Sequence, residues 1–242
     1  MFSFFNKTSP PIFEGLCDIH NHLLPGIDDG CKEVQDSHRM LEAYKELGFV
    51  QVIPTPHVYS ELYPNTPQSV KSSFDVLQDS MGSENIQVKR YAAEYMVDEQ
   101  FMADFEQRSP ELLLPNNICL VEIHFFGNTQ ILEQAGFQLL QQGIKPLLAH
   151  PERYHGINDL KKFSELKGRG FKLQLNALSL LGHYGDDVKQ KAFKIMDLGL
   201  YDYLGTDAHR PGHLHLLKEI RLNKKQLLSW EEIRERQIAD FR

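Results

Sequence analysis

The chain of 242 residues has only three cysteines, Cys17, Cys31 and Cys119, and no Cys-x-x-Cys pair. Such sparse thiols argue against a disulfide framework and against a zinc ribbon. No cysteine stands six positions before an arginine, and no Asp-x-Asp sequence occurs. The chain therefore lacks the nucleophile motifs of cysteine-dependent and aspartyl-phosphate phosphatases. We expect the three cysteines to behave as small buried hydrophobic side chains.

Basic charge and long apolar runs are also scarce. The 26 basic residues are outnumbered by 33 acidic ones, giving a net charge of −7, which argues against a nucleic-acid surface. No apolar run approaches the roughly 20 residues of a membrane span, so we expect a cytoplasmic protein without membrane insertion. Because no repeat, low-complexity tract or linker divides the sequence, we predict one domain over residues 1–242.

Apolar β-favouring runs alternate with amphipathic stretches through the whole chain. Helical spacing of apolar residues marks 34–47, 131–140 and 188–196, and Gly48, Gly143, Gly170 and Gly199 are expected as left-handed helix ends. Seven strands are predicted, at 15–20, 49–54, 86–95, 118–124, 145–150, 171–176 and 201–206. This order predicts an α/β fold with parallel strands, namely a distorted seven-stranded (β/α)7 barrel with its site at the carboxyl ends of the strands. An open doubly wound sheet is the alternative.

The segment DIHNHLLPGIDDG, residues 18–30, carries the densest set of metal-binding side chains. Side chains at i and i+2 of a strand share a face, so His20 and His22 point the same way, about 6–7 Å apart. That spacing allows both imidazoles to reach one metal ion. Asp29 follows a Pro-Gly turn and returns an oxygen donor to the same end of the strand, whereas Asp28 is taken as a turn residue. Residues 60–68, with two prolines, are expected to form a longer loop over the mouth.

Later predicted strands also end in imidazoles and carboxylates. These residues are His57, Glu94, Glu122, His150, Asp207 and His209. Glu122 is the most telling of them, because a carboxylate within an apolar strand is costly to bury unless it is paired or metal-bound. In a barrel the strand ends meet at one mouth, so we expect these donors to gather there.

Donors of this kind indicate a hydrolytic metal centre. Imidazole and carboxylate without thiolate suit Mn²⁺, Fe or Zn²⁺, and the number of donors suggests two or three ions. Such ions lower the pKa of a bound water and hold the attacking and leaving oxygens. Arg153 and Arg210 lie beside candidate ligands, and a planar guanidinium there suits a phosphate group.

These motifs resemble those of the PHP (polymerase and histidinol phosphatase) superfamily, and more narrowly the bacterial manganese-dependent tyrosine-protein phosphatases of the CpsB and YwqE type. The motifs that carry the resemblance are DIHNHLLPGIDDG (18–30), TPH (55–57), AEY (93–95), VE (121–122), AHPERY (149–154), QLN (174–176) and TDAH (206–209). They span almost the entire chain. The resemblance implies the distorted seven-stranded barrel, a three-metal site and hydrolysis of phosphotyrosine by a metal-activated hydroxide.

The resemblance also implies a role for each candidate residue. His20, His22, Glu94 and Asp207 would hold the first metal, and Glu94 would bridge to a second one held by Glu122 and His150. Asp29, His57 and His209 would hold the third. Arg153 matches the phosphate-binding arginine of the family, and Arg210 is the candidate for a second phosphate contact. The implied partner is a phosphotyrosine protein, a bacterial tyrosine kinase of capsule or exopolysaccharide synthesis.

Two other functions remain compatible with the same residues. The first is a small-molecule phosphomonoesterase, such as histidinol phosphatase, with the same metal chemistry. The second is a binding module in which the metals only stabilise the fold. The sequence keeps every proposed ligand, which favours an enzyme over a binding module.

Overall fold

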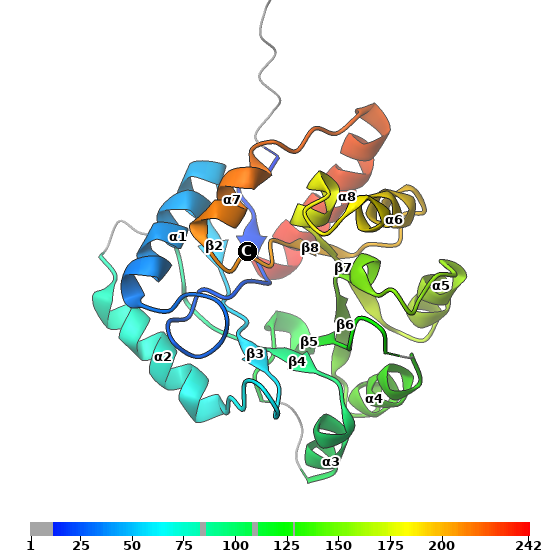
Figure 1. Cartoon of the computed structure of the whole chain (residues 1–242), viewed down its shortest axis with the longest axis horizontal. Coiled ribbons are helices and arrows are strands. Elements are labelled where there is room, and N and C mark those ends of the chain that lie inside the picture. Colours follow the sequence, from blue (N-terminus) through cyan, green and yellow to red (C-terminus); the bar gives the residue numbers. More distant parts are fainter. Residues whose placement is uncertain (1–11, 83–85, 108–110, 128) are drawn as a thin grey trace, which may run out of the picture.

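The computed structural model describes residues 12–82, 86–107, 111–127 and 129–242. Its centre is a curled parallel sheet with helices packed around the outside (Figure 1). The strands are β1 (Cys17–Asp18), β2 (Gln51–Val52), β3 (His57–Val58), β4 (Glu94–Met96), β5 (Ile118–Glu122), β6 (Lys145–Ala149), β7 (Lys172–Asn176) and β8 (Tyr203–Gly205). β3 to β8 form one sheet in sequential order, β1 and β2 form a second, and all pairs are parallel.

Backbone hydrogen bonds continue the curl beyond these ladders. After β8, Asp207 N donates to His20 O at 2.8 Å, which joins the last strand to the first. On the other side, Ala92 N donates to Pro54 O and Glu94 N to Pro56 O. Pro54 and Pro56 have no N–H to donate, so this part of the ladder is interrupted and β2 and β3 are separate short strands. The predicted α/β fold with parallel strands is confirmed as a curled half-barrel.

Eight helices surround the sheet in the described part of the chain. They are α1 (Val34–Leu47), α2 (Pro67–Ser80), α3 (Glu99–Gln107), α4 (Thr129–Gln141), α5 (Lys161–Gly168), α6 (Asp186–Asp197), α7 (Pro211–Leu217) and α8 (Lys224–Phe241). Short 3-10 turns occupy Pro115–Asn117, Pro151–Arg153 and Ala177–Leu181. None of these helices is both long enough and apolar enough to cross a membrane.

Local sequence signals explain several helix ends. The helix predicted at 34–47 is α1, and the four glycines expected as left-handed helix ends have φ between 65° and 100°. The loop predicted at 60–68 ends earlier than expected, because α2 begins at Pro67. Thr66 and Ser69 form a reciprocal capping box there, which starts the helix earlier than the prolines suggested.

The strand predicted at 86–95 is also much shorter in the structure. Only Glu94–Met96 is a strand, and the earlier part makes a single bridge, between Gln87 and Gln51. Lys89 and Arg90 are exposed in this stretch, so alternating burial does not extend through it. Apolar content alone overestimated the strand.

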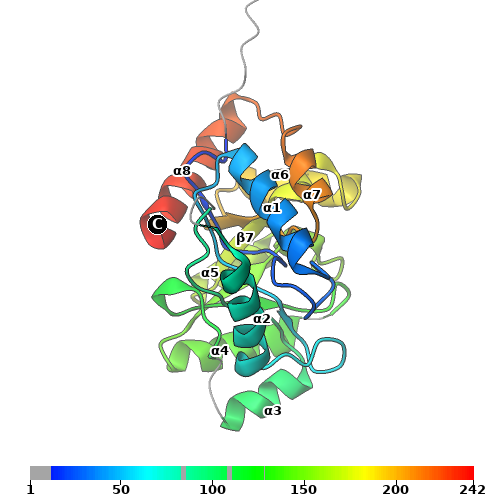
Figure 2. The same ribbon diagram turned by 90° about the vertical axis from the view of Figure 1, so that its left-hand side faces the viewer.

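The interior of the half-barrel has an apolar layer beneath a polar one. Along β5, Ile118, Leu120 and Glu122 alternate and therefore share the inner face. Ile118 and Leu120 belong to a buried apolar cluster, whereas Glu122 stands at the carboxyl end of the strand. The amino ends are covered by α8, where Gln237 Nε2 donates to the carbonyl oxygens of Cys17 and Leu204. Figure 2 shows α8 on the side of the molecule opposite α7. All three cysteines are buried and unpaired, as predicted.

Candidate functional site

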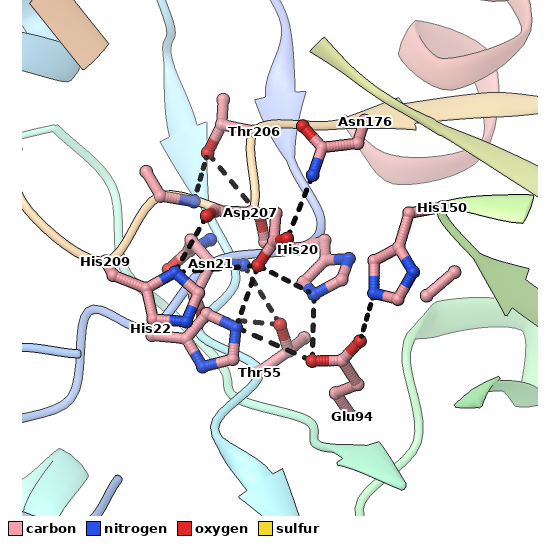
Figure 3. A network of polar contacts seen from close by, with 12 residues as sticks. His20, Asn21, His22, Thr55, Glu94, His150, Asn176, Thr206, Asp207 and His209 are labelled. Carbon is pink, nitrogen blue, oxygen red and sulfur yellow. Dashed lines mark hydrogen bonds and ion pairs between the residues drawn. The ribbon is translucent and has the colours of Figure 1, made fainter. Parts of the chain in front are cut away.

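The nine predicted metal ligands come together at the carboxyl ends of the strands. Most of them are seen in Figure 3, where Glu94 lies between His20 and His150. They are His20, His22, Asp29, His57, Glu94, Glu122, His150, Asp207 and His209. All of them except His150 form three overlapping groups that differ in burial, and His150 lies beside the group that contains Glu122.

The first group, which we call the inner cluster, consists of His20, His22, Glu94 and Asp207. One donor atom from each lies within 4.8 Å of the others, and all four residues are buried. His20 Nε2 lies 3.0 Å from Glu94 Oε2 and 3.5 Å from Asp207 Oδ1. His22 Nε2 lies 3.5 and 3.2 Å from the same two oxygens. Two imidazoles and two carboxylates therefore converge on one point, as the ligands of a divalent metal do.

The second group joins Glu94 to Glu122 through two further imidazoles. His57 Nδ1 lies 3.2 Å from Glu94 Oε2 and 3.0 Å from Glu122 Oε1. His150 Nε2 lies 3.0 Å from Glu94 Oε1 and 3.8 Å from Glu122 Oε2. Because its two oxygens face different imidazoles, Glu94 has the arrangement of a carboxylate that bridges two ions.

The third group lies at the rim, where donor atoms of Asp29, His57 and His209 come within 4.8 Å of one another and of the buried His22. We call Asp29, His57 and His209 the outer group. Asp29 Oδ1 lies 3.6 Å from His57 Nε2 and 3.4 Å from His209 Nε2. The Asp29 side chain is 48% exposed, against 0% for Glu94. His57 therefore faces two groups, with Nδ1 toward the glutamates and Nε2 toward Asp29. The resemblance implied only the second of these placements.

Two polar side chains fix the orientation of the inner imidazoles. Gln174 Oε1 lies 2.9 Å from His20 Nδ1, and Asp28 Oδ2 lies 2.8 Å from His22 Nδ1. Since both partners accept hydrogen bonds, each Nδ1 carries the proton and each Nε2 presents its lone pair to the cluster. Asp28 thus does more than form the expected turn, although its Oδ1 also accepts from Gly30 N. Its position six residues after His22 was the available signal in the sequence.

A buried aspartate beneath the inner cluster holds its two strands together. Asp18 Oδ2 accepts hydrogen bonds from Tyr44 OH and from Thr206 Oγ1, and Asp18 Oδ1 accepts one from Thr206 N. Burial raises the pKa of Asp18 in spite of these hydrogen bonds. The contacts fix the backbone on both sides of the site, just before His20 and just before Asp207.

The backbone also shows strain at two candidate ligands. His150 has φ of 33° and Asp207 has φ of 50°, in the left-handed region that residues with a side chain seldom adopt. Close packing restricts the neighbouring strand as well, since a Cβ at Gly205 would lie 2.5 Å from that of His20. Strain and close approach of this kind concentrate at functional sites.

The chemistry of the donor set fits bound metal ions. Among the described residues, His20 Nε2 and Glu94 Oε2 are buried without a hydrogen-bond partner, although they lie only 3.0 Å apart. Buried polar atoms are nearly always satisfied, so two unsatisfied acceptors that face each other indicate a shared cation. The residues of the inner cluster fit a metal ion best, because their imidazoles are oriented by hydrogen bonds and all four side chains are buried.

Without metal, protons take the place of the cation. Burial alone would lower the pKa of His20, but the carboxylates of Glu94 and Asp207 raise it to about 9. Burial likewise opposes ionisation of Glu94, yet the imidazoles of His20 and His57 hold its pKa well below the usual range. Metal binding at this cluster must therefore release protons.

The two candidate arginines differ in placement. Arg153 is largely buried, and its Nη1 donates to Asp207 Oδ2 at 2.7 Å. Arg210 is exposed and precedes α7. Both line a cavity of about 470 Å³ beside the inner cluster and the outer group, with Tyr184, Lys32 and His213. The structure therefore brings Arg153 against the inner cluster and leaves Arg210 at the rim of the same cavity.

Comparison with known proteins extends over most of the chain. The family model described as "Capsular polysaccharide synthesis, CpsB/CapC" matches residues 16–218. The tyrosine-protein phosphatase YwqE of Bacillus subtilis (strain 168) is 29% identical over 196 residues, which cover 80% of this chain and 77% of YwqE. The tyrosine-protein phosphatase CpsB of Streptococcus pneumoniae is 24% identical over 221 residues, covering 86% of this chain and 90% of CpsB.

Solved structures give the same relationship. One match comes from the crystal structures of YwqE from Bacillus subtilis and CpsB from Streptococcus pneumoniae, described as unique metal-dependent tyrosine phosphatases. Its TM-score is 0.75 at 25% identity, covering 94% of this chain and 96% of that one. An inactive dihydroorotase-like domain of Chaetomium thermophilum shares the fold, with a TM-score of 0.51 at 12% identity over 81% of this chain and 64% of that one. All nine candidate ligands lie within the residues matched by the family model.

Proposed function

This chain belongs to the CpsB/CapC family, and from that membership and the geometry of its metal centre we propose that it is a metal-dependent protein-tyrosine phosphatase. The observation that carries the proposal is the inner cluster beside Arg153. Two oriented imidazoles and two carboxylates share one point there, and a guanidinium contacts one of the carboxylates. A metal site with a fixed guanidinium at its edge suits hydrolysis of a phosphate monoester.

We propose a ligand set for each of three ions. The inner cluster would hold the first ion. Glu94, Glu122 and His150 would hold the second, and Asp29, His57 and His209 would hold the third. The donor set combines imidazoles with several carboxylates and has no thiolate. We therefore propose Mn²⁺ as the bound metal, with Fe and Zn²⁺ as the other candidates.

The side chains prepare the site for a phosphate dianion. Bound metal ions would supply an activated water and would offset charge on the phosphoryl oxygens. Arg153 uses Nη1 to contact Asp207, which leaves other N–H groups to donate to phosphate. Asn176 Nδ2 donates to the same oxygen, Asp207 Oδ2, and so helps to fix the carboxylate. A tyrosyl leaving group has a pKa near 10, so it needs less protonation than an alkoxide does.

The partner and setting are part of the same proposal. The names of the relatives support a phosphotyrosine protein as substrate, and the family description refers to capsular polysaccharide synthesis. We propose that the substrate is a bacterial tyrosine kinase of capsule or exopolysaccharide synthesis. We place the reaction in the cytoplasm. We also propose that residues 1–242 form one domain and that β2 and β3 are parts of one strand of a seven-stranded barrel.

A side-by-side assay tests the proposed function. Metal-free protein is supplied with Mn²⁺, Fe²⁺ or Zn²⁺ and offered phosphotyrosine peptide, phosphoserine peptide and histidinol phosphate. We expect chelator-sensitive turnover with the highest kcat/KM on phosphotyrosine. His20→Ala and Arg153→Ala are expected to lose at least about a hundredfold in kcat/KM, because each removes a charged or ligating group from the reaction centre.

Each alternative function predicts a different result. A higher kcat/KM on histidinol phosphate would assign the chain to small-molecule phosphomonoesterases. Metal that raises the Tm without hydrolysis of any of these phosphoesters would identify a binding module instead. Glu42→Gln, which changes an exposed carboxylate on α1, is the matched control and should retain wild-type activity.

A further inference from the structure

The guanidinium of Arg153 is in contact with two aromatic rings from different parts of the chain. Its Cζ lies 4.6 Å from the centroid of the Phe125 ring and 4.1 Å from that of the Tyr184 ring. Phe125 belongs to the segment between β5 and α4, and Tyr184 to the segment before α6. Cations within about 6 Å of a ring centroid are attracted by the negative face of the ring. Three segments thus meet at one charged group beside the inner cluster.

The segment that carries Phe125 is packed against the segment that follows Arg153. Gly156 N donates to Phe125 O at 3.3 Å, and the Phe126 ring stacks on His155 with 5.3 Å between centroids. There is no room for a side chain at the crossing, since a Cβ on Gly156 would lie 2.7 Å from Gly127 O. The position of the Phe125 ring is therefore coupled to the backbone of the arginine segment.

Tyr184 is coupled to the metal centre instead. Asn176 Nδ2 donates to Tyr184 OH at 3.1 Å and to Asp207 Oδ2 at 2.9 Å. Asp207 Oδ2 in turn accepts from Arg153 Nη1. The ring that contacts Arg153 and the carboxylate that pairs with it are thus held by the same amide.

We propose that Phe125 and Tyr184 are positioning residues that hold the Arg153 guanidinium in its phosphate-binding orientation, an inference that rests on the proposed phosphatase function. A long arginine side chain loses considerable rotamer freedom when it binds a ligand. The two rings and Asp207 impose much of that order beforehand. The rings contact the guanidinium and Asp207 takes one N–H of Nη1, so the other N–H groups can donate to phosphoryl oxygens.

The test separates the ring from the rest of each side chain. Phe125→Leu and Tyr184→Leu remove an aromatic face, while Phe125→Tyr and Tyr184→Phe keep it. Each leucine variant is expected to weaken inhibition by inorganic phosphate and to raise KM for a phosphotyrosine peptide by about three- to tenfold. Phe125→Tyr should stay within about twofold of wild type, and Tyr184→Phe, which keeps the ring but loses the Asn176 hydrogen bond, should lose clearly less than Tyr184→Leu. Phe137→Leu, which removes an exposed ring from α4, is the matched control.

A double-mutant cycle with Arg153→Ala distinguishes positioning from a general structural role. If the rings act through Arg153, adding Phe125→Leu or Tyr184→Leu to Arg153→Ala should change phosphate affinity little further. Equal losses with and without Arg153 would overturn the proposal, and so would equal losses in the leucine and ring-retaining variants. Metal content is measured in every variant and should equal that of wild type.

Phosphate binding is followed by calorimetry as well as by inhibition. If wild-type protein bound phosphate but hydrolysed no phosphotyrosine, the proposed function would fail. The calorimetric cycle would still decide whether the rings act through Arg153. Conversely, an active enzyme whose leucine variants bind phosphate like wild type would overturn the positioning role alone.

Discussion

The inner cluster and the outer group use the same kinds of donor in two different environments. The four residues of the inner cluster are buried, and acceptors behind His20 and His22 fix which nitrogen faces inward. In the outer group, the side chains of Asp29, His57 and His209 are 48%, 15% and 22% exposed, and Asp29 is carried by a loop. The two groups therefore offer similar donor atoms, but only the donors of the inner cluster are held in place before a metal binds.

This difference predicts an order of metal affinity. An ion at the inner cluster would meet ligands that are already oriented and desolvated, so little ordering remains to oppose binding. An ion at the outer group must compete with water and must order a partly exposed aspartate. We expect the inner ion to remain bound after gel filtration and the outer ion to exchange.

Glu94→Gln should have the largest effect, because Glu94 takes part in both buried groups. The substitution keeps the shape but removes the charge that faces four imidazoles, those of His20, His22, His57 and His150. We expect at least about a thousandfold loss in kcat/KM, or roughly 4 kcal/mol of transition-state stabilisation. Elemental analysis after gel filtration should show the loss of one or two tightly held ions per chain. Full metal retention would contradict the bridging role.

Asp29→Asn should affect the outer ion alone. We expect the metal concentration for half-maximal activity to rise roughly a hundredfold, because a carboxylate ligand is lost at a site that is already exposed to water. The tightly held metal measured after gel filtration should not change. If Asp29→Asn instead emptied the inner cluster, the two groups would act as one cooperative site and the proposed affinity order would be wrong.

The sequence predicted the donors of both groups because they depend on local pattern. His20 and His22 lie two residues apart at a strand end, and Glu122 is a carboxylate within an apolar strand. Their division among ions came from resemblance to a family. We did not predict that His57 would contact Glu122 through Nδ1 and Asp29 through Nε2. These two contacts depend on how the imidazole ring is oriented between the two carboxylates.

Supporting residues could not be assigned from sequence alone. Gln174 reaches His20 across 154 residues, and an amide in a strand carries no signal of its partner. The sequence explains Asp28 fully as a turn residue that accepts from Gly30 N. That explanation left its second contact, with His22 Nδ1, unpredicted. The break between β2 and β3 depends on the missing donors of Pro54 and Pro56, which matter only when the neighbouring strand is known.

Gln174→Leu tests whether preorganisation itself separates the two groups. The substitution removes the acceptor for His20 Nδ1 and leaves every proposed ligand in place. Loss of such a partner should weaken metal binding at the inner cluster by about tenfold, measured by competition with a chelator. The metal concentration that fills the outer group should be unaffected. Equal weakening at both groups would show that Gln174 supports the fold generally.

The smallest expected effect is a pH dependence that belongs to the metal-free inner cluster. An unfolded histidine has a pKa near 6.5, and Glu94 and Asp207 raise the pKa of folded His20 to about 9. Above pH 6.5 the folded chain therefore binds more protons than the unfolded chain, and the free energy of unfolding should fall as pH rises. Asp28 and Asp207 also raise the pKa of His22, which adds a slope of the same sign. His20 alone should contribute about 1 kcal/mol per pH unit, so the total fall should be at least that large, measured by urea unfolding in chelator between pH 6.5 and 8. Lys191, with a pKa lowered to about 8, gives a slope of opposite sign above this window. With metal bound, His20 carries no proton on Nε2, so the slope from this cluster should vanish; an equal slope with and without metal would place its origin outside the inner cluster.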